Sequence, residues 1–110
     1  MIMLSICTGY AESIGATTVF HGAAQVDSEA GYWDGTQEFL DQINNINNLN
    51  RRDRVDVRAP LIKLSKKEII ELGLKNGLDF SKTWTCYQGE KLACGKCPAC
   101  SSRIHLLVQV

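Results

Sequence analysis

The chain has 110 residues, enough for one small domain, and its 45% apolar and 22% charged residues are ordinary for a folded protein. Twelve basic and twelve acidic residues cancel, so no net field favours nucleic acid or an anionic membrane as a partner. No run approaches the roughly 18 apolar residues of a membrane span, and the first ten residues do not resemble a secretory signal. We therefore expect a cytoplasmic protein without nucleic-acid or membrane partners.

The first elements predicted along the chain are a helix and a buried strand. Apolar side chains recur at helical spacing over Ile2–Ile14, and Gly15 is a plausible end of the helix. This stripe consists of Leu4, Cys7, Ala11 and Ile14. Cys7 is expected to be a small core residue. The short, β-branched segment Thr17–Ala23 predicts a buried strand.

A polar loop and an amphipathic helix are predicted next. The loop covers Gln25–Gly35, and the helix covers Thr36–Leu49 with Thr36 as its N-cap. The side chains expected to face inward are Phe39, Leu40, Ile43, Ile46 and Leu49.

The second half begins with a short extended segment at Val55–Pro60. Ser65 and Glu68 have the spacing of a capping box, which opens a helix at Lys66–Lys75 that Gly77 ends. Alternating helices and strands are typical of an α/β protein with a parallel sheet. Two strands are few for such a sheet, so we expect part of a larger one, a single partial domain over residues 1–110.

Four cysteines near the end of the chain are the most specific feature of the sequence. They have the spacing C-x7-C-x2-C-x2-C and are Cys86, Cys94, Cys97 and Cys100. Four thiolates within fifteen residues can surround one tetrahedral Zn²⁺ in a closed structural site. We therefore assign residues 1–85 to the α/β part and residues 86–103 to a zinc-binding loop.

Other interpretations of the cysteines remain. Two disulfides would require an oxidising compartment, and a thioredoxin-type pair would need one C-x-x-C motif at the start of a helix. An iron–sulfur cluster is also held by four cysteine thiolates. The zinc site is favoured because two overlapping C-x-x-C units share Cys97 and a fourth cysteine lies upstream.

The segment APLIKLSKKEIIELGLKNGLDFSKTWTCYQGEKLACGKCPACSSR closely resembles the 7-cyano-7-deazaguanine synthase family of the PP-loop ATP-pyrophosphatase superfamily. The family pattern is P-L-x-x-L-S-K-x-E-I, then T-W-S-C-Y, then C-G-x-C-x-x-C-x-x-R. A weaker likeness extends upstream through Gly9–Ala16 and Gly31–Phe39. The resemblance thus covers nearly the whole chain and implies the C-terminal part of a Rossmann-like parallel sheet with a four-cysteine zinc loop.

The resemblance implies a ligase that converts 7-carboxy-7-deazaguanine, ammonia and ATP into a nitrile for queuosine and archaeosine precursors. It further implies a structural Zn²⁺ on the four cysteines, and ATP and Mg²⁺ in the complete enzyme. The residues expected to bind substrate are Asp27, Tyr32, Asp34 and Trp84. The two aspartates could instead be solvated loop acids, and Trp84 could cover the zinc loop rather than stack on a base. Catalytic residues are not predicted.

Three departures from the family pattern affect these expectations. The family's Ser-Gly-Gly-x-Asp-Ser loop, whose backbone N–H groups bind phosphate, is absent from this sequence, so no ATP turnover by this chain alone is expected. Trp33, Gly35 and Thr36 replace the Pro, Cys and Arg of the family's Tyr-Pro-Asp-Cys-Arg segment. Finally, the family continues as a helix after Arg103, whereas Ile104–Val110 is expected to be a short apolar tail.

These observations leave three hypotheses: a half of the enzyme, a zinc-binding interaction module, and a non-functional remnant. A half-sheet exposes an apolar edge, so we expect a homodimer or a complex with an N-terminal half.

Overall fold

The computed structural model of the protein describes residues 1–89 and 91–108 and contains two compact units, Met1–Ser65 and Lys66–Val110. The first unit contains α1 (Ile2–Ser13), β1 (Thr18–Phe20), α2 (Gln25–Glu29), the 3-10 helix η1 (Trp33–Gly35), α3 (Gln37–Asn47) and β2 (Asp56–Arg58). The second contains α4 (Lys66–Lys75), the 3-10 helix η2 (Phe80–Lys82) and α5 (Pro98–Val108). The predicted α/β class is confirmed. None of the described helices is long and apolar enough to cross a bilayer.

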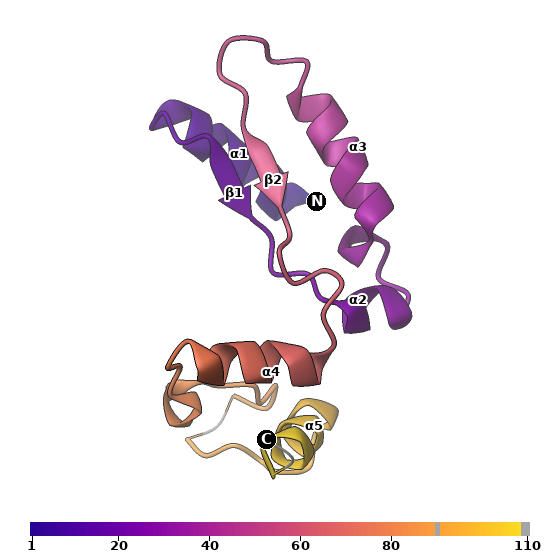
Figure 1. Ribbon diagram of the computed structural model, residues 1–110, viewed down its shortest axis with the longest axis vertical. Coiled ribbons are helices and arrows are strands. Elements are labelled where there is room, and N and C mark those ends of the chain that lie inside the picture. Colours follow the sequence, from indigo (N-terminus) through magenta and orange to yellow (C-terminus); the bar gives the residue numbers. More distant parts are fainter. Residues whose placement is uncertain (90, 109–110) are drawn as a thin grey trace. The chain divides into compact units, whose positions relative to one another are not determined.

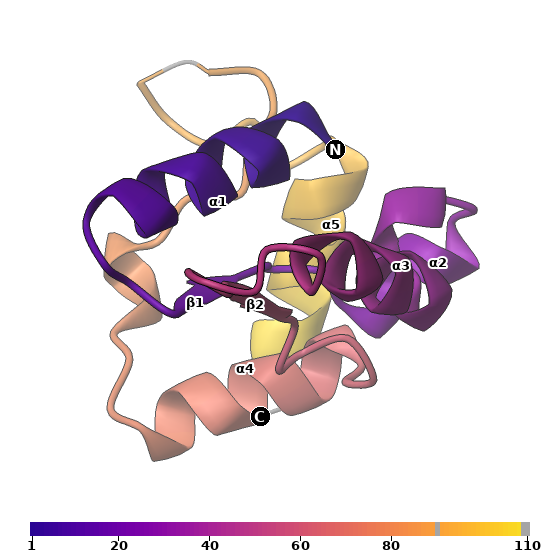
Figure 2. The same ribbon diagram turned by 90° about the horizontal axis from the view of Figure 1, so that it is seen from above.

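The core of the first unit forms where α3 packs on a two-stranded parallel sheet (Figure 1). Figure 2 shows α1 and α3 both lying beside the two strands. The buried side chains of this cluster are Phe39, Leu40, Ile43, Val57 and Ala59, and Leu4, Val19 and Ile62 pack against it. The predicted amphipathic pattern is therefore confirmed for the first two turns of α3.

The ladder between β1 and β2 uses every second residue of β2, as parallel pairing requires. The backbone N–H of Asp56 donates to the carbonyl of Thr17 at 2.9 Å, and the N–H of His21 donates to the carbonyl of Arg58 at 2.8 Å. The residue between them, Val57, therefore directs its backbone groups away from β1, to the outer edge of β2.

Side-chain amides of α3 occupy that outer edge. The Asn44 amide donates to the Val57 carbonyl and accepts from the Val57 N–H, both at 2.8 Å. Asn47 donates to the carbonyl of Val55 at 3.0 Å. Because Val55 and Val57 are each only 1% exposed, these bonds satisfy backbone groups that water does not reach. The asparagine-rich end of α3 thus closes the edge of β2.

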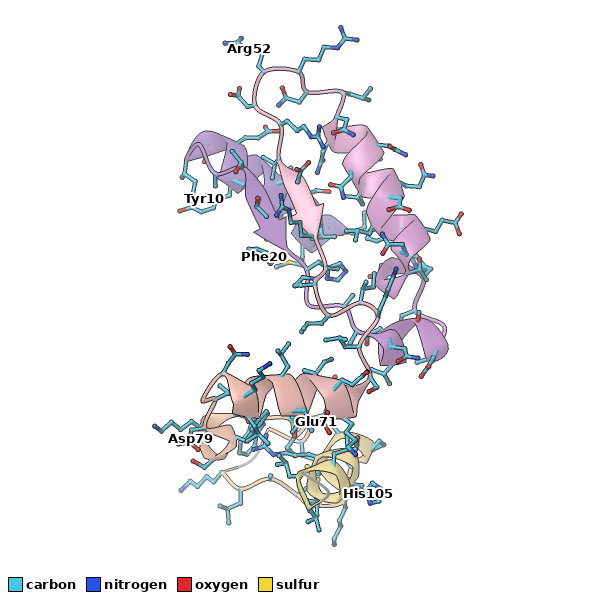
Figure 3. All side chains as sticks on the ribbon, viewed as in Figure 1. Tyr10, Phe20, Arg52, Glu71, Asp79 and His105 are labelled. Atoms are coloured by element: carbon cyan, nitrogen blue, oxygen red, sulfur yellow. The ribbon has the colours of Figure 1, made fainter. Side chains whose placement is uncertain are left out.

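The opposite edge of the sheet is open in the described part of the chain. By the same alternation, Thr18 and Phe20 direct their backbone groups away from β2, and no described strand lies there. Figure 3 shows the Phe20 side chain on β1 and the Tyr10 side chain on α1 projecting away from α3, and they are 70% and 66% exposed. This edge of β1 is available for pairing with another strand, and its apolar surroundings are available for packing.

Several core positions predicted from periodicity are wrong. Ile46 and Leu49 are 57% and 79% exposed, because α3 ends at Asn47 and its last sheet-facing positions are taken by asparagines. On α1, Ile14 is 60% exposed and Cys7 is exposed, so Cys7 is not a core residue. Only Ala11 of α1 is buried, because the described part of the unit covers just one narrow face of the helix.

The predicted loop Gln25–Gly35 is instead largely helical, and the strand expected over Thr17–Ala23 is shorter, Thr18–Phe20. The Asp27 carboxylate accepts the backbone N–H of Ala24 at 2.8 Å and thereby closes the first turn of α2. A local side-chain bond of this kind is not visible to a periodicity argument.

In the second unit, α4 is confirmed at Lys66–Lys75, and Gly77 ends it with a left-handed φ of 75°. Ile70 is buried, whereas Leu72 and Leu74 are 41% and 45% exposed. The apolar tail predicted for Ile104–Val110 is wrong, because α5 continues through Val108; residues 109–110 lie outside the described residues.

Candidate metal centre

Three local structures bring the four cysteines together. Cys86 follows η2, Cys94 precedes a tight turn at Gly95, and Cys100 lies in the first turn of α5. Gly95 has a φ of 67°, a conformation that glycine adopts without strain. The turn therefore lets the Cys94–Cys97 segment direct two sulfurs to the same point.

The geometry of the four sulfurs fits one tetrahedral ion. All four Sγ atoms lie within 4.8 Å of one another, and those of Cys94 and Cys100 are 4.0 Å apart. Metal–sulfur bonds of about 2.3 Å in a tetrahedron place the sulfurs about 3.8 Å apart. The four predicted cysteines thus lie together, and their sulfur–sulfur distances are close to those that zinc requires.

Backbone N–H groups point at the sulfurs and favour their charged form. The N–H of Cys94 lies 3.4 Å from Cys86 Sγ, the N–H of Cys97 lies 3.3 Å from Cys94 Sγ, and the N–H of Cys100 lies 3.4 Å from Cys97 Sγ. The thiolate is the form that binds metal. This arrangement therefore prepares the loop for an ion rather than for four neutral thiols.

The pKa values of the thiols differ according to their surroundings. Backbone N–H donors, those of Tyr87 and Cys100, lower the pKa of Cys97 to about 6, and the N–H of Cys94 lowers the pKa of Cys86. Burial raises the pKa of Cys100 to about 12. A metal ion must therefore displace the proton of Cys100 at neutral pH.

This donor set fits a structural zinc ion. Four protein thiolates leave no coordination position for water or substrate, so such an ion would stabilise the loop and not react. All five cysteines are unpaired, which argues against the disulfide interpretation. An iron–sulfur cluster uses the same ligands and remains an alternative.

Two side chains fasten the loop to the rest of its unit. The indole N–H of Trp84 donates to the carbonyl of Cys86 at 2.8 Å, although the residue stays 53% exposed. The guanidinium of Arg103 on α5 donates to Thr83 Oγ1 at 2.9 Å and also to the Phe80 carbonyl. The segment leading into the first cysteine is thus tied to the helix that contains the last one.

A cavity of about 270 Å³ in the first unit collects three of the four residues predicted to bind substrate. Asp27, Tyr32 and Asp34 line it together with His21, whose Nε2 lies 3.0 Å from the backbone carbonyl oxygen of Asp34. The fourth, Trp84, lines a different cavity of about 440 Å³ within the second unit.

Comparison with known families assigns the chain. A family model described as queuosine biosynthesis protein QueC matches residues 1–110. The chain belongs to the QueC family.

Curated QueC relatives are similar over 96% of the chain. A "7-cyano-7-deazaguanine synthase 1" from Colwellia psychrerythraea is 40% identical over 105 residues, which are 48% of that protein. The 7-cyano-7-deazaguanine synthases of Alteromonas mediterranea and Clostridium kluyveri are 43% and 39% identical, with 48% and 49% of their lengths covered. The chain therefore spans about half the length of the curated QueC relatives that it matches.

The departures from the QueC pattern at Trp33, Gly35 and Thr36 fit together in the structure. The Trp33 ring packs edge-to-face on Phe39 with centroids 5.1 Å apart. Thr36 Oγ1 accepts the N–H of Phe39 at 3.2 Å and caps α3. A Cβ at position 35 would come within 2.7 Å of Asp27 Cβ, so Asp27 could approach a larger residue only after a local shift. The sequence shows the substitutions, but the contacts that make them compatible are visible only in the structure.

Proposed function

We propose that this chain is the zinc-binding C-terminal part of a 7-cyano-7-deazaguanine synthase, a ligase that forms the nitrile from 7-carboxy-7-deazaguanine, ammonia and ATP. The observation that carries the proposal is the QueC match over the whole chain, with the four-cysteine cluster assembled. The sulfur geometry and the N–H donors support zinc as the ion and a structural role for it.

ATP and Mg²⁺ are proposed to bind to the part of the relatives that this chain does not cover. A glycine-rich loop in that part would hold the phosphates through backbone N–H groups. Its strands would extend a Rossmann-like sheet from β1, because Thr18 and Phe20 leave that edge open while Asn44 and Asn47 occupy the edge of β2. A complex with this N-terminal half is therefore the preferred assembly, with a homodimer as the second possibility.

The contribution of this chain would be to bind and orient the substrate while the other part activates it. The reaction as proposed passes through an acyl adenylate, an amide and a second activation before dehydration. The adenylate must be kept from water, which requires a closed and rigid wall around it. An ion on the four cysteines, together with the contacts of Trp84 and Arg103, would keep the cysteine loop rigid in the complete enzyme.

Complementation tests this function directly. The chain is purified with its metal, mixed with an N-terminal half of a relative that contains Ser-Gly-Gly-x-Asp-Ser, and assayed for nitrile and AMP by mass spectrometry. We expect product only in the mixture. Cys100→Ser should abolish it, whereas Cys7→Ser, an exposed cysteine outside the cluster, should not. The proposal fails if the zinc-loaded mixture forms no nitrile while a full-length relative does under the same conditions.

That negative result would favour the two other hypotheses. Binding of a protein partner by the zinc-loaded chain would indicate an interaction module. A chain that binds zinc but neither complements nor binds a partner would be a remnant. Reducing conditions belong in every assay, since we place the protein in the cytoplasm, where thiols stay reduced.

A further inference from the structure

The cavity at the carboxyl end of β1 has a size and a position that suit a small ligand. Ligands of parallel α/β sheets bind beyond the carboxyl ends of the strands, and His21 directly follows β1 there. Its volume of about 270 Å³ is just below the roughly 300 Å³ at which pockets for drug-sized molecules begin. This volume suits one bicyclic base.

Two lining residues are held so that they present hydrogen-bond acceptors. His21 Nε2 lies 3.0 Å from the Asp34 backbone carbonyl oxygen, which can only accept, so Nε2 is the donor of this pair. In the tautomer that carries its hydrogen on Nε2, Nδ1 is an acceptor. Asp27 Oδ2 takes the N–H of Ala24, which fixes the carboxylate. Gly35 permits this close approach, because a Cβ there would lie 2.7 Å from Asp27 Cβ and force a shift.

The Asp34 carboxylate accepts no hydrogen bond from another described residue, although its Oδ2 forms an ion pair with the Met1 amino group. Its side chain is 45% exposed, and the nearest cation is the Met1 amino group, 4.0 Å from Oδ2. No lysine or arginine is among the described residues that line the cavity. An anionic ligand group would therefore be repelled here, and N–H donors would be attracted.

A metal ion does not explain these acceptors. Among the described residues, the only group of three or more potential ligands close enough to hold an ion is the cysteine cluster. The ligand atoms of His21, Asp27 and Asp34 are thus not gathered closely enough to hold one ion, which leaves them to accept from N–H groups of an organic ligand. Tyr32, which is 62% exposed and lines the same cavity, offers a ring face on which a planar base can stack.

We propose that this cavity binds the aminopyrimidinone edge of a 7-deazaguanine, with the Asp34 carboxylate accepting from the ring N1–H and the 2-amino group. These two adjacent donors match the two oxygens of a carboxylate, as in other bidentate charge-assisted pairs. The choice of a deazaguanine rests on the proposed function. The carboxylate or nitrile substituent of the base would then point away from Asp34, since it lies on the other ring.

The test is calorimetric titration of the zinc-loaded chain, alone and with the N-terminal half of a relative. The probes are 7-cyano-7-deazaguanine, the same compound without its 2-amino group, and ammonium chloride. We expect removal of the 2-amino group to weaken binding by roughly 5- to 100-fold, the range of one bidentate contact. Asp34→Asn should weaken binding of the complete base to a similar extent. Glu29→Gln, which removes the same charge from an exposed position on α2, should leave binding unchanged.

The analogue series needs no variant, so it stays decisive if Asp34→Asn fails to fold. Equal binding of the two bases, absence of binding in both samples, or displacement of the base by ammonium would overturn the inference. Nitrile formation without discrimination of the 2-amino group would leave the proposed function standing and this inference refuted. Discriminated binding without nitrile formation would support the site and count against the function.

Discussion

The hydrogen bonds between Asn44 and β2 predict a large loss of stability when the Asn44 side chain is truncated. Asn44→Ala removes both hydrogen bonds to Val57, whose backbone groups are buried. Leaving a buried donor and a buried acceptor unsatisfied costs about 1–3 kcal/mol each. Alanine has a higher helix propensity than asparagine and returns about 0.6 kcal/mol. The free energy of unfolding of the first unit should therefore fall by about 1.5–5 kcal/mol.

The neighbouring residue provides a matched control. Asn45 lies on the exposed side of α3, so Asn45→Ala should leave stability unchanged or raise it slightly. Urea unfolding can be followed by Trp33 emission in a Trp84→Phe background, because the chain has two tryptophans, one in each unit. Equal unfolding midpoints for the two alanine variants would refute the role assigned to Asn44.

Three further predictions concern the metal and the cavity corner. Cys100→Ser, or removal of zinc by a chelator, should abolish the helical circular dichroism of the second unit but leave Trp33 emission unchanged; loss of both signals would contradict this. The pKa of Cys97 is lowered to about 6, and that of Cys100 is raised to about 12. Zinc binding at pH 7 must therefore release the Cys100 proton, so the affinity for zinc should rise with pH. Competition with a chromophoric chelator at pH 6, 7 and 8 measures this, and a pH-independent affinity would refute it. Gly35→Ala should destabilise the first unit by about 1–3 kcal/mol through its clash with Asp27, whereas Gly22→Ala, with open space around it, should be nearly neutral in the same urea titration.

The cysteine cluster and the long helices could be predicted from sequence because each depends on local patterns. The C-x2-C steps place sulfurs within one turn, and the Ser65–Glu68 spacing marks the start of α4. The parallel pairing of β1 and β2 agrees with the expected class, although the Rossmann-like topology remains a prediction.

The errors share a physical cause, which is that burial depends on what covers a residue. Ile46 and Leu49 have the correct period to be core residues, yet the sheet-facing end of α3 is polar. Cys7 lies on a face of α1 that the described residues leave uncovered. The density of asparagine at Ile43–Asn50 was visible in the sequence, but only the register of β2 shows which backbone groups these amides satisfy.

The amides on β2 also limit how copies of this chain could associate through their sheets. Strand addition continues indefinitely only when each copy has two usable edges, as in fibrils. Here one edge is already bonded to Asn44 and Asn47, so a pairing through β1 consumes the remaining edge. Association by this route therefore stops once the β1 strands of two copies have paired, because neither copy has a second free edge.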